Sequence, residues 1–196
     1  MWDERYATPG HAYGESPNDF LAEQAALLPP GPVVDLAGGE GRNAVFLAQR
    51  GHAVTLVDGS AVALKNAEAL AASRGCTITT VHTDLAAYEL GTEQWAGAVS
   101  IWAHTPKTLR ARLHRDLVRA LRPGGALILE AYTPDQLALK TGGPPDADRY
   151  MTLAGLRSEL QGLDIIVGRE LQREVQEGAY HRGLSAVVQV VARKPA

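Results

Sequence analysis

Residues 33–60 constrain the fold of this chain more than any other stretch; they read VVDLAGGEGRNAVFLAQRGHAVTLVDGS. It begins with a short apolar run, passes through a glycine-rich turn into a helical pattern, and ends in a second apolar run closed by Asp58. A strand, a turn, a helix and a strand in this order make a βαβ unit, whose strands are parallel. The stretch therefore predicts a parallel sheet that is covered by helices.

The same alternation continues along the chain. Helices are predicted within residues 16–32 and over 41–51, 60–75 and 106–121, and strands over 33–37, 52–58, 77–84, 96–103 and 126–132. Beyond them lie a glycine- and proline-rich loop over 140–148, a short helix over 152–160, and β-type runs over 163–175 and 184–194. The pattern predicts an α/β fold with a Rossmann-like, doubly wound sheet of seven strands, mostly parallel and ending in an antiparallel hairpin.

Composition narrows the class of protein. The chain has 196 residues and a net charge of −3, which fits one domain without a basic surface for nucleic acid. The arginine-rich stretch 108–123 predicts an amphipathic helix with a solvated basic face, and His11, His52, His82 and His114 are expected on the surface or in strands. One cysteine, no signal-peptide pattern and no apolar run of membrane-spanning length favour a soluble, cytoplasmic protein.

The glycine turn predicts a ligand site. Gly38, Gly39 and Gly41 let a ligand approach the backbone and the free N–H groups of the following helix. Asp58 ends the next strand, where a carboxylate can accept hydrogen bonds from both ribose hydroxyls. A nucleoside is therefore expected. GEGRNA also fits the pattern for NAD, but Asp35 would repel a pyrophosphate and suits a cationic ligand such as S-adenosylmethionine. An NAD-dependent oxidoreductase and a non-catalytic nucleoside-binding module remain as alternatives.

The motifs resemble a known family, the class I S-adenosylmethionine-dependent methyltransferases, and within it the small bacterial tellurite-resistance type. Residues 33–60 are similar to its first two motifs and ALRPGGALILEAYTP to its fifth-strand region. WDERYA and YGESPNDFL resemble its N-terminal segment, and EGAYHRGLSAVVQVVARK resembles its C-terminal hairpin. In one departure, Ala37 stands at the first glycine of the family, where its methyl group crowds the methionine end of the site.

The resemblance implies S-adenosylmethionine as cofactor and S-adenosylhomocysteine as product. It places Asp35 at the methionine end, Asp58 at the ribose, and Asp84 with Leu85 at the adenine; a turn cap is the alternative for Asp84. The full set of expected cofactor-binding residues is Arg5, Tyr13, Asp35, Ala37, Gly38, Gly39, Gly41, Asn43, Asp58, Gly59, Ser60, Asp84 and Leu85.

Transfer of a methyl group needs positioning and exclusion of water more than a dedicated catalytic group. The catalytic candidates are Trp102 and His104. Trp102 could turn an aromatic face toward the sulfonium, with a core or lid aromatic as the alternative. His104 could accept a proton from the substrate or orient it, with a helix cap as the alternative. The spacing of His104, Glu177 and His181 fits no metal motif, so no metal is expected. The role of Glu177 and His181 stays open.

The predicted organisation is one domain, with residues 1–30 as an aromatic lid segment and first helix, and 31–196 as the methyltransferase domain. In a chain without an added substrate domain we expect a small-molecule methyl acceptor, no nucleic acid or membrane partner, and a monomer or homodimer.

Overall fold

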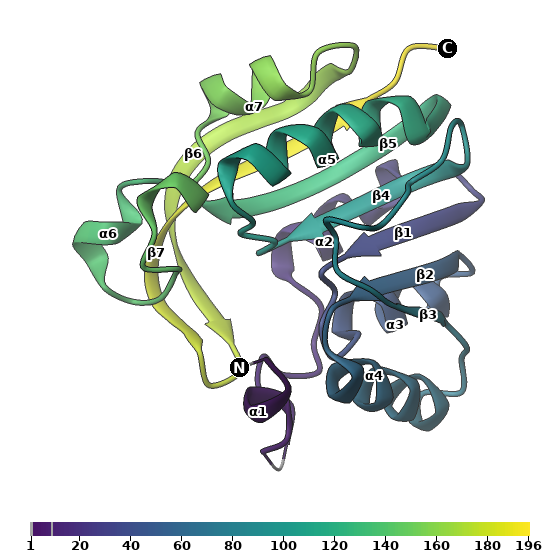
Figure 1. Ribbon diagram of the computed structural model, residues 1–196, viewed down its shortest axis with the longest axis vertical. Helices are drawn as coiled ribbons and strands as arrows, with labels where there is room; N and C mark the ends of the chain where they lie inside the picture. The colour runs from purple at the N-terminus through teal and green to yellow at the C-terminus, as the bar shows by residue number, and fades with distance from the viewer. Residues whose placement is uncertain (1, 9) are drawn as a thin grey trace.

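The strands predicted from the sequence form one mixed sheet (Figure 1). Over residues 2–8 and 10–196, which the computed structural model describes, this sheet has seven strands in the order β3-β2-β1-β4-β5-β7-β6. The strands are β1 Pro32–Leu36, β2 Ala53–Asp58, β3 Thr79–His82, β4 Trp95–Ile101, β5 Leu121–Tyr132, β6 Asp164–Glu177 and β7 His181–Arg193. The helices are α1 Trp2–Tyr6, α2 Asp19–Gln24, α3 Arg42–Gln49, α4 Ala61–Ser73, α5 Lys107–Ala120, α6 Gln136–Leu139 and α7 Leu153–Glu159, with single 3-10 turns at Ala25–Leu27 and Ala147–Arg149.

Strand pairing sets the position of the carboxyl ends. Strand β1 is parallel to both β2 and β4, so that Asp35 lies opposite Leu56 on one side and Val99 on the other. Strands β3 and β5 extend the parallel part, and β7 and β6 add an antiparallel pair at the far edge. This confirms the predicted fold class. The carboxyl ends of β1, β2 and β4 meet at one edge, where ligands bind in such sheets.

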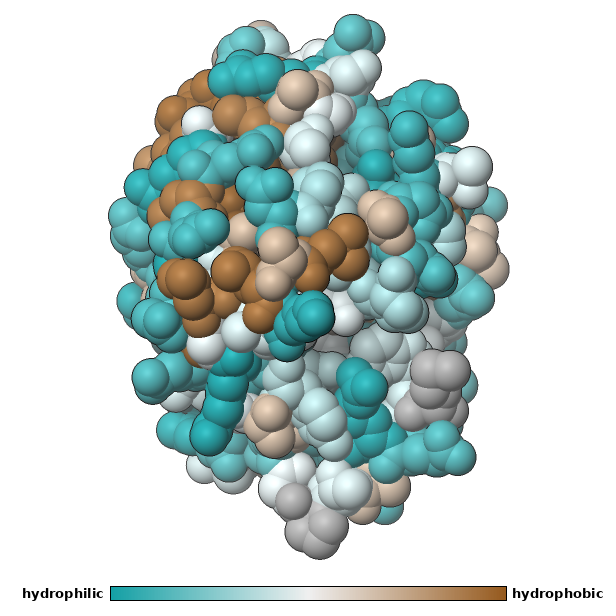
Figure 2. Space-filling view, turned by 90° about the vertical axis from the view of Figure 1, so that its left-hand side faces the viewer, coloured by the Kyte–Doolittle hydropathy of each residue, from teal (hydrophilic) through white to brown (hydrophobic). Residues whose placement is uncertain are grey.

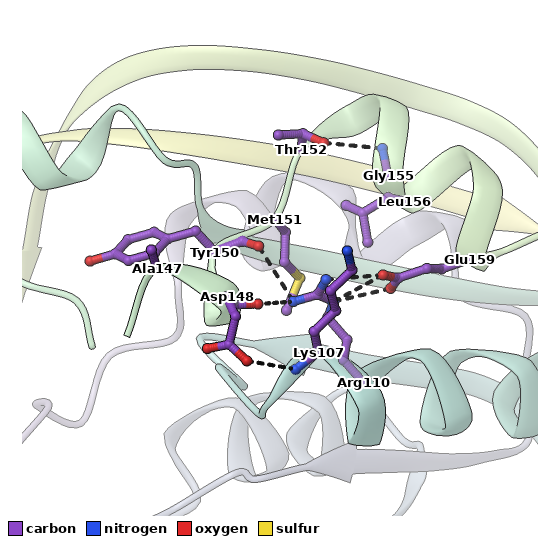
Figure 3. Close-up of a pocket in the computed structure, with 10 residues that line it drawn as sticks. All are labelled: Lys107, Arg110, Ala147, Asp148, Tyr150, Met151, Thr152, Gly155, Leu156 and Glu159. Atoms are coloured by element: carbon purple, nitrogen blue, oxygen red, sulfur yellow. Dashed lines mark hydrogen bonds and ion pairs between the residues drawn. The ribbon is translucent and has the colours of Figure 1, made fainter. Parts of the chain in front are cut away.

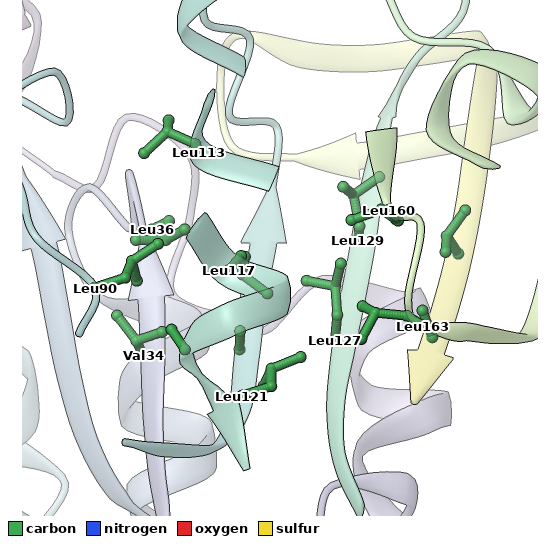
Figure 4. Close-up of a cluster of buried hydrophobic side chains, with 14 of the residues drawn as sticks. Val34, Leu36, Leu90, Leu113, Leu117, Leu121, Leu127, Leu129, Leu160 and Leu163 are labelled. Carbon is green, nitrogen blue, oxygen red and sulfur yellow. The ribbon is translucent and has the colours of Figure 1, made fainter. Parts of the chain in front are cut away.

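Helices cover both faces of the sheet. On one face α5 and α7 pack on β1, β4 and β5; the cluster includes Val34, Leu36, Leu113, Leu117, Leu127, Leu129 and Leu160 (Figure 4). On the other face α2, α3 and α4 contribute Phe20, Leu47 and Leu64 to a second cluster with Val33 and Leu56. The central strands are apolar on both sides because both sides are buried, as expected for parallel strands between helical layers.

Several boundaries differ from the sequence prediction. The first predicted helix divides into α2 and a 3-10 turn, and Asn18 caps α2 by accepting a hydrogen bond from the N–H of Leu21 at 3.0 Å. Strand β5 starts at Leu121 and takes up the predicted RPGG turn as an irregular extension. Strands β6 and β7 are longer than predicted, so residues 178–180 alone connect them. Helix α1 lies in a segment for which no element was predicted.

Figure 2 views the molecule from the side of the edge strand β6, where patches of apolar residues alternate with hydrophilic ones. Large exposed apolar side chains of this region are Ile166, Leu184 and Leu137. Among the described residues, none of the helices combines the length and the hydropathy that crossing a membrane requires.

Candidate functional site

The turn between β1 and α3 has an unusual backbone. Ala37, Gly39 and Gly41 have φ values of 55°, 55° and 81°, in the left-handed region that glycine tolerates best. A side chain at Gly38 would lie 2.6 Å from the Asp35 carboxylate, and one at Gly41 would lie 2.6 Å from the methyl group of Ala67. Close packing therefore leaves no room for a side chain at Gly38 or Gly41. Ala37 adopts a conformation that costs an L-residue roughly 1–2 kcal/mol.

Asp35 lies beneath this turn and is 1% exposed. Its two carboxylate oxygens have no hydrogen-bond partner within the described part of the chain. Burial raises its pKa from the ordinary 3.8 to about 7; the charge of Arg42 and the nearby backbone N–H of Ala44, which forms no hydrogen bond of normal geometry with it, oppose this increase only in part. A buried acid without a partner is costly, so Asp35 is the strongest single indication that this edge binds a cation.

Asp58 ends β2 beside the same turn. Its carboxylate accepts hydrogen bonds from the N–H groups of Gly39 and Ser60, both at 2.9 Å. Burial raises the pKa of Asp58, while these N–H groups oppose the increase. Ser60 caps α4 through the N–H of Ala63 at 3.1 Å. The glycine turn and Asp58, both predicted to bind the cofactor, are thus in direct contact.

The N-terminal segment lies over the turn. Tyr6 is 7% exposed, and a side chain at Gly39 would come within 2.9 Å of its hydroxyl. The N–H of Ala12 donates to Glu40 at 2.7 Å, which fastens the segment to the residue between Gly39 and Gly41. The Ser60 hydroxyl donates to Asp3. Tyr6 and Glu40 were not among the predicted site residues, although Tyr6 belongs to the WDERYA motif.

Arg5 and Tyr13 face each other across this segment. The Arg5 guanidinium donates to the Tyr13 hydroxyl at 2.8 Å and lies 4.7 Å from the ring centre of Tyr180. The Tyr13 ring is 4.7 Å from that of His181. The Tyr13 ring also lies 5.8 Å from that of Tyr180, so Arg5 and Tyr13 both contact the connection between β6 and β7.

The remaining cofactor predictions occupy different surroundings. The Asn43 amide oxygen accepts the N–H of Asn18 at 3.0 Å, inside the protein. Gly59 contacts His82, whose ring nitrogen lies 3.2 Å from the Gly59 carbonyl oxygen. Asp84 is exposed and caps a turn by accepting the N–H of Ala86 at 2.7 Å, and Leu85 packs into the core. The turn cap, the alternative for Asp84, is thus present, and a contact with adenine stays a prediction.

The two catalytic candidates lie in a cluster of aromatic rings. Trp102 follows β4 with a φ of 60°, and its ring centre is 4.5 Å from that of Tyr132. The His104 Nε2 accepts the N–H of Tyr132 at 3.0 Å, and burial lowers its pKa to about 3. His104 is therefore neutral with an engaged lone pair. Its predicted role as proton acceptor would require that this hydrogen bond be given up.

A network of buried charges around Glu177 was not predicted. The Glu177 carboxylate accepts hydrogen bonds from the Trp102 indole at 2.6 Å, from Asn18 at 2.7 Å and from Arg42. Its neighbour Glu130, which is fully buried, binds Arg173. Arg173 also donates to Glu177, at 3.3 Å from the same strand, but the other three donors come from distant parts of the sequence, so no local pattern could have found the whole network.

A cavity of about 220 Å³ lies between α5 and α7, away from the glycine turn (Figure 3). One wall is Arg110, whose guanidinium binds Glu159 at 3.0 to 3.2 Å. The His114 Nδ1–H donates to the same carboxylate at 2.7 Å. Two expectations are wrong here. His114 is not a surface residue, and Arg110 is not on a solvated face, because both are buried against Glu159 where α7 packs on α5.

The residues at the sheet edge fit the implied cofactor. Asp35 offers a carboxylate to a cation, Asp58 can accept from hydroxyl groups, and the turn at Gly39 lies beneath the Tyr6 hydroxyl. Within residues 2–8 and 10–196, there is no cluster of three or more histidine, cysteine or acidic side chains suited to hold a metal ion.

Comparison with known proteins finds similarity to methyltransferases. Residues 33–125 match the family described as methyltransferase domain. The 2-heptyl-1-hydroxyquinolin-4(1H)-one methyltransferase of Mycobacteroides abscessus is 30% identical over 121 residues, 60% of this chain and 51% of that protein. The tRNA 5-carboxymethoxyuridine methyltransferase of Escherichia coli is 31% identical over 114 residues, 55% of this chain and 42% of that protein. The chain spans about half the length of the curated relatives it matches.

Solved structures agree on the fold. A SAM-dependent methyltransferase of Methanosarcina mazei matches with a TM-score of 0.73 and 18% identity, over 92% of this chain and 99% of that one. TehB of Haemophilus influenzae matches with a TM-score of 0.74 and 18% identity, over 98% of this chain and 65% of that one. Residues 33–125 therefore match the family described as methyltransferase domain, and the chain as a whole shares its fold with a SAM-dependent methyltransferase and with TehB.

Proposed function

We propose that this protein transfers a methyl group from S-adenosylmethionine to a small-molecule acceptor by in-line displacement and releases S-adenosylhomocysteine. The observation that carries the proposal is the buried, unpartnered carboxylate of Asp35 beneath the glycine turn. A ligand with a positive charge supplies the missing partner, whereas the pyrophosphate of NAD would be repelled. This favours the methyltransferase over the NAD-dependent oxidoreductase.

The cofactor supplies a methyl group that is already activated on a sulfonium. In the proposal, Asp35 binds the ammonium group, Asp58 orients the ribose hydroxyls, and Asp84 with Leu85 borders the adenine. The segment from residue 2 to residue 14 forms the predicted lid: Tyr6 covers Gly39, and Arg5 and Tyr13 close the side toward the hairpin. Excluding water in this way strengthens every charge interaction inside the site.

Two observations support a small acceptor. Rings of Trp102, His104, Tyr132 and His181 pack 4.5 to 6.2 Å apart near the carboxyl ends of β4 and β5; Tyr132 is fully buried, and the three partly exposed rings would border a compact apolar or aromatic acceptor. A protein that methylates tRNA needs a basic surface to bind the RNA, and the net charge of −3 gives no indication of one. The acceptor atom is left open.

Calorimetric titration with S-adenosylmethionine, S-adenosylhomocysteine and NAD tests the cofactor. We expect the first two to bind and NAD not to bind. Binding of NAD alone would replace the proposal by the oxidoreductase. A second assay follows transfer of a labelled methyl group to a panel of phenols, hydroxyquinolones, thiols, tellurite and bulk tRNA. Cofactor binding with no transfer to any of them would favour the non-catalytic nucleoside-binding module.

A further inference from the structure

Glu177, the last residue of β6, joins four elements of the fold at one carboxylate. It is 5% exposed, and one of its oxygens accepts both the Trp102 indole N–H, at 2.6 Å, and the Arg42 guanidinium. The other oxygen accepts the Asn18 amide at 2.7 Å. Burial alone would raise the pKa of Glu177, but His181, Arg42 and Trp102 hold it far below its usual range. The residue is therefore a fixed negative charge.

Two of these donors belong to the proposed site. Arg42 opens α3 immediately after Gly41, the last glycine of the turn. Trp102 stands at the carboxyl end of β4 and holds a left-handed φ of 60°, which a bulky residue keeps only when its surroundings impose it. Because Arg42 and Trp102 donate to the same oxygen, Glu177 fixes the indole relative to the start of α3.

The hydrogen bond also changes the ring. A carboxylate that accepts the indole N–H pushes electron density into the π system, and charge-assisted bonds are stronger than neutral ones. An electron-richer ring attracts a cation over its face more strongly. Of the two forms of the cofactor, only S-adenosylmethionine carries the sulfonium charge, so any such attraction separates the substrate from the product.

We propose that Glu177 is a positioning residue of the methyl-transfer site: it orients and polarises Trp102, so that the ring attracts the sulfonium and the site prefers S-adenosylmethionine to S-adenosylhomocysteine. The inference rests on the proposed function and assigns a role to the EGAYH segment. It also gives the C-terminal hairpin a part in releasing the spent cofactor.

Glu130 provides a matched control in the same network. It is fully buried, binds Arg173 through two hydrogen bonds of 2.8 Å, and accepts from Asn18 and from Gln189. Neither Trp102 nor Arg42 is among its described side-chain partners. The substitution Glu130→Gln therefore removes a buried carboxylate from the same cluster and leaves the Trp102 contact in place.

The test measures dissociation constants for both cofactor forms by calorimetry in the parent, Glu177→Gln, Trp102→Phe and Glu130→Gln. In Glu177→Gln and Trp102→Phe we expect the preference for S-adenosylmethionine to fall by about three- to tenfold, the range of an exposed to partly desolvated cation–π contact. In Glu130→Gln we expect the preference to stay within about twofold of the parent, even if the melting temperature of this variant falls as far as that of Glu177→Gln. The tryptophan fluorescence of the ligand-free Glu177→Gln protein should also shift relative to both the parent and Glu130→Gln.

Equal preference in the parent and in Glu177→Gln, or an equal loss in both glutamine variants, would show a structural role and overturn the inference. If Glu177→Gln does not fold, Glu177→Asp takes its place in the same comparison, because it keeps the charge and draws the carboxylate away from the indole N–H; a preference equal to that of the parent would overturn the inference. A parent that binds neither cofactor form refutes the proposed function itself, which separates the two failures.

Discussion

Asp35 makes the stability of the ligand-free protein depend on pH. The folded protein raises the pKa of this carboxyl from 3.8 to about 7, so the folded state holds the proton more tightly than the unfolded state does. For an acid with a raised pKa, the destabilisation is absent below the unfolded value and grows as the pH rises. It is complete above the folded value, where the difference amounts to about 4 kcal/mol at 1.36 kcal/mol per pKa unit.

The substitution Asp35→Asn removes this titration. The amide is itself buried without a partner, at a cost of about 1–3 kcal/mol that does not depend on pH. The useful quantity is therefore the change between two pH values. From pH 5.5 to pH 8.0 we expect the free energy of unfolding of the parent to fall by about 2 kcal/mol relative to the variant, from the same pKa values.

Urea unfolding of both proteins at the two pH values measures this difference. Histidines and other groups titrate in both proteins and cancel in the comparison. Saturating S-adenosylmethionine should abolish the excess pH dependence of the parent, because the ammonium group pairs with the carboxylate. Binding should then release a proton near pH 6.5, seen as a buffer-dependent enthalpy. Parallel stability curves for the two free proteins would refute the reasoning, since Asp35 would then not be an unpaired acid.

Two substitutions and one deletion probe the site further. Asp58→Ala should weaken cofactor binding by about one to two decades, the value of about 1.5–3 kcal/mol for hydrogen bonds to a charged acceptor; calorimetry measures it, and an unchanged affinity at unchanged melting temperature would remove Asp58 from the ribose site. Ala37→Gly relieves the left-handed backbone but gains freedom in the unfolded chain, so we expect cofactor affinity to rise while the melting temperature stays within a few degrees; weaker binding would contradict this account of Ala37. Deletion of residues 1–14 should leave the sheet folded, weaken cofactor binding, and reduce turnover at saturating cofactor by more than the binding loss; full turnover would make the segment a mere tail.

The sequence was informative wherever local chemistry determines local structure. The alternation of apolar runs and helical patterns predicted every strand of the sheet and its doubly wound class. Asn18 was recognisable as a cap, and Gly39 and Gly41 do take the left-handed conformation that glycine permits. Boundaries were less accurate, because pairing with β7 extends β6 to Glu177 although its outer residues are polar.

Contacts between distant segments could not be predicted in the same way. His114 and Arg110 look like solvated residues of an amphipathic helix, and only the packing of α7 brings Glu159 to them. Tyr6 became visible as a site residue because the fold places it over Gly39. Tyr6 and Gly39 each belong to a recognisable motif, but a single sequence does not show that the two motifs meet.

The meeting of the N-terminal segment with the C-terminal hairpin has a consequence for the order of folding. The N–H of Ala179 donates to the carbonyl oxygen of Ala12 at 2.9 Å, and Asn18 binds Glu177 across 159 residues of sequence. Closing so long a loop costs entropy before its contacts return any free energy, and chains with such high contact order fold slowly. We therefore expect the βαβ core to form first, and the contacts between the N-terminal segment and the β6–β7 hairpin to form last. Competence to bind the cofactor would then report on completion of folding, recovering in the slowest refolding phase while most of the helical signal has already returned.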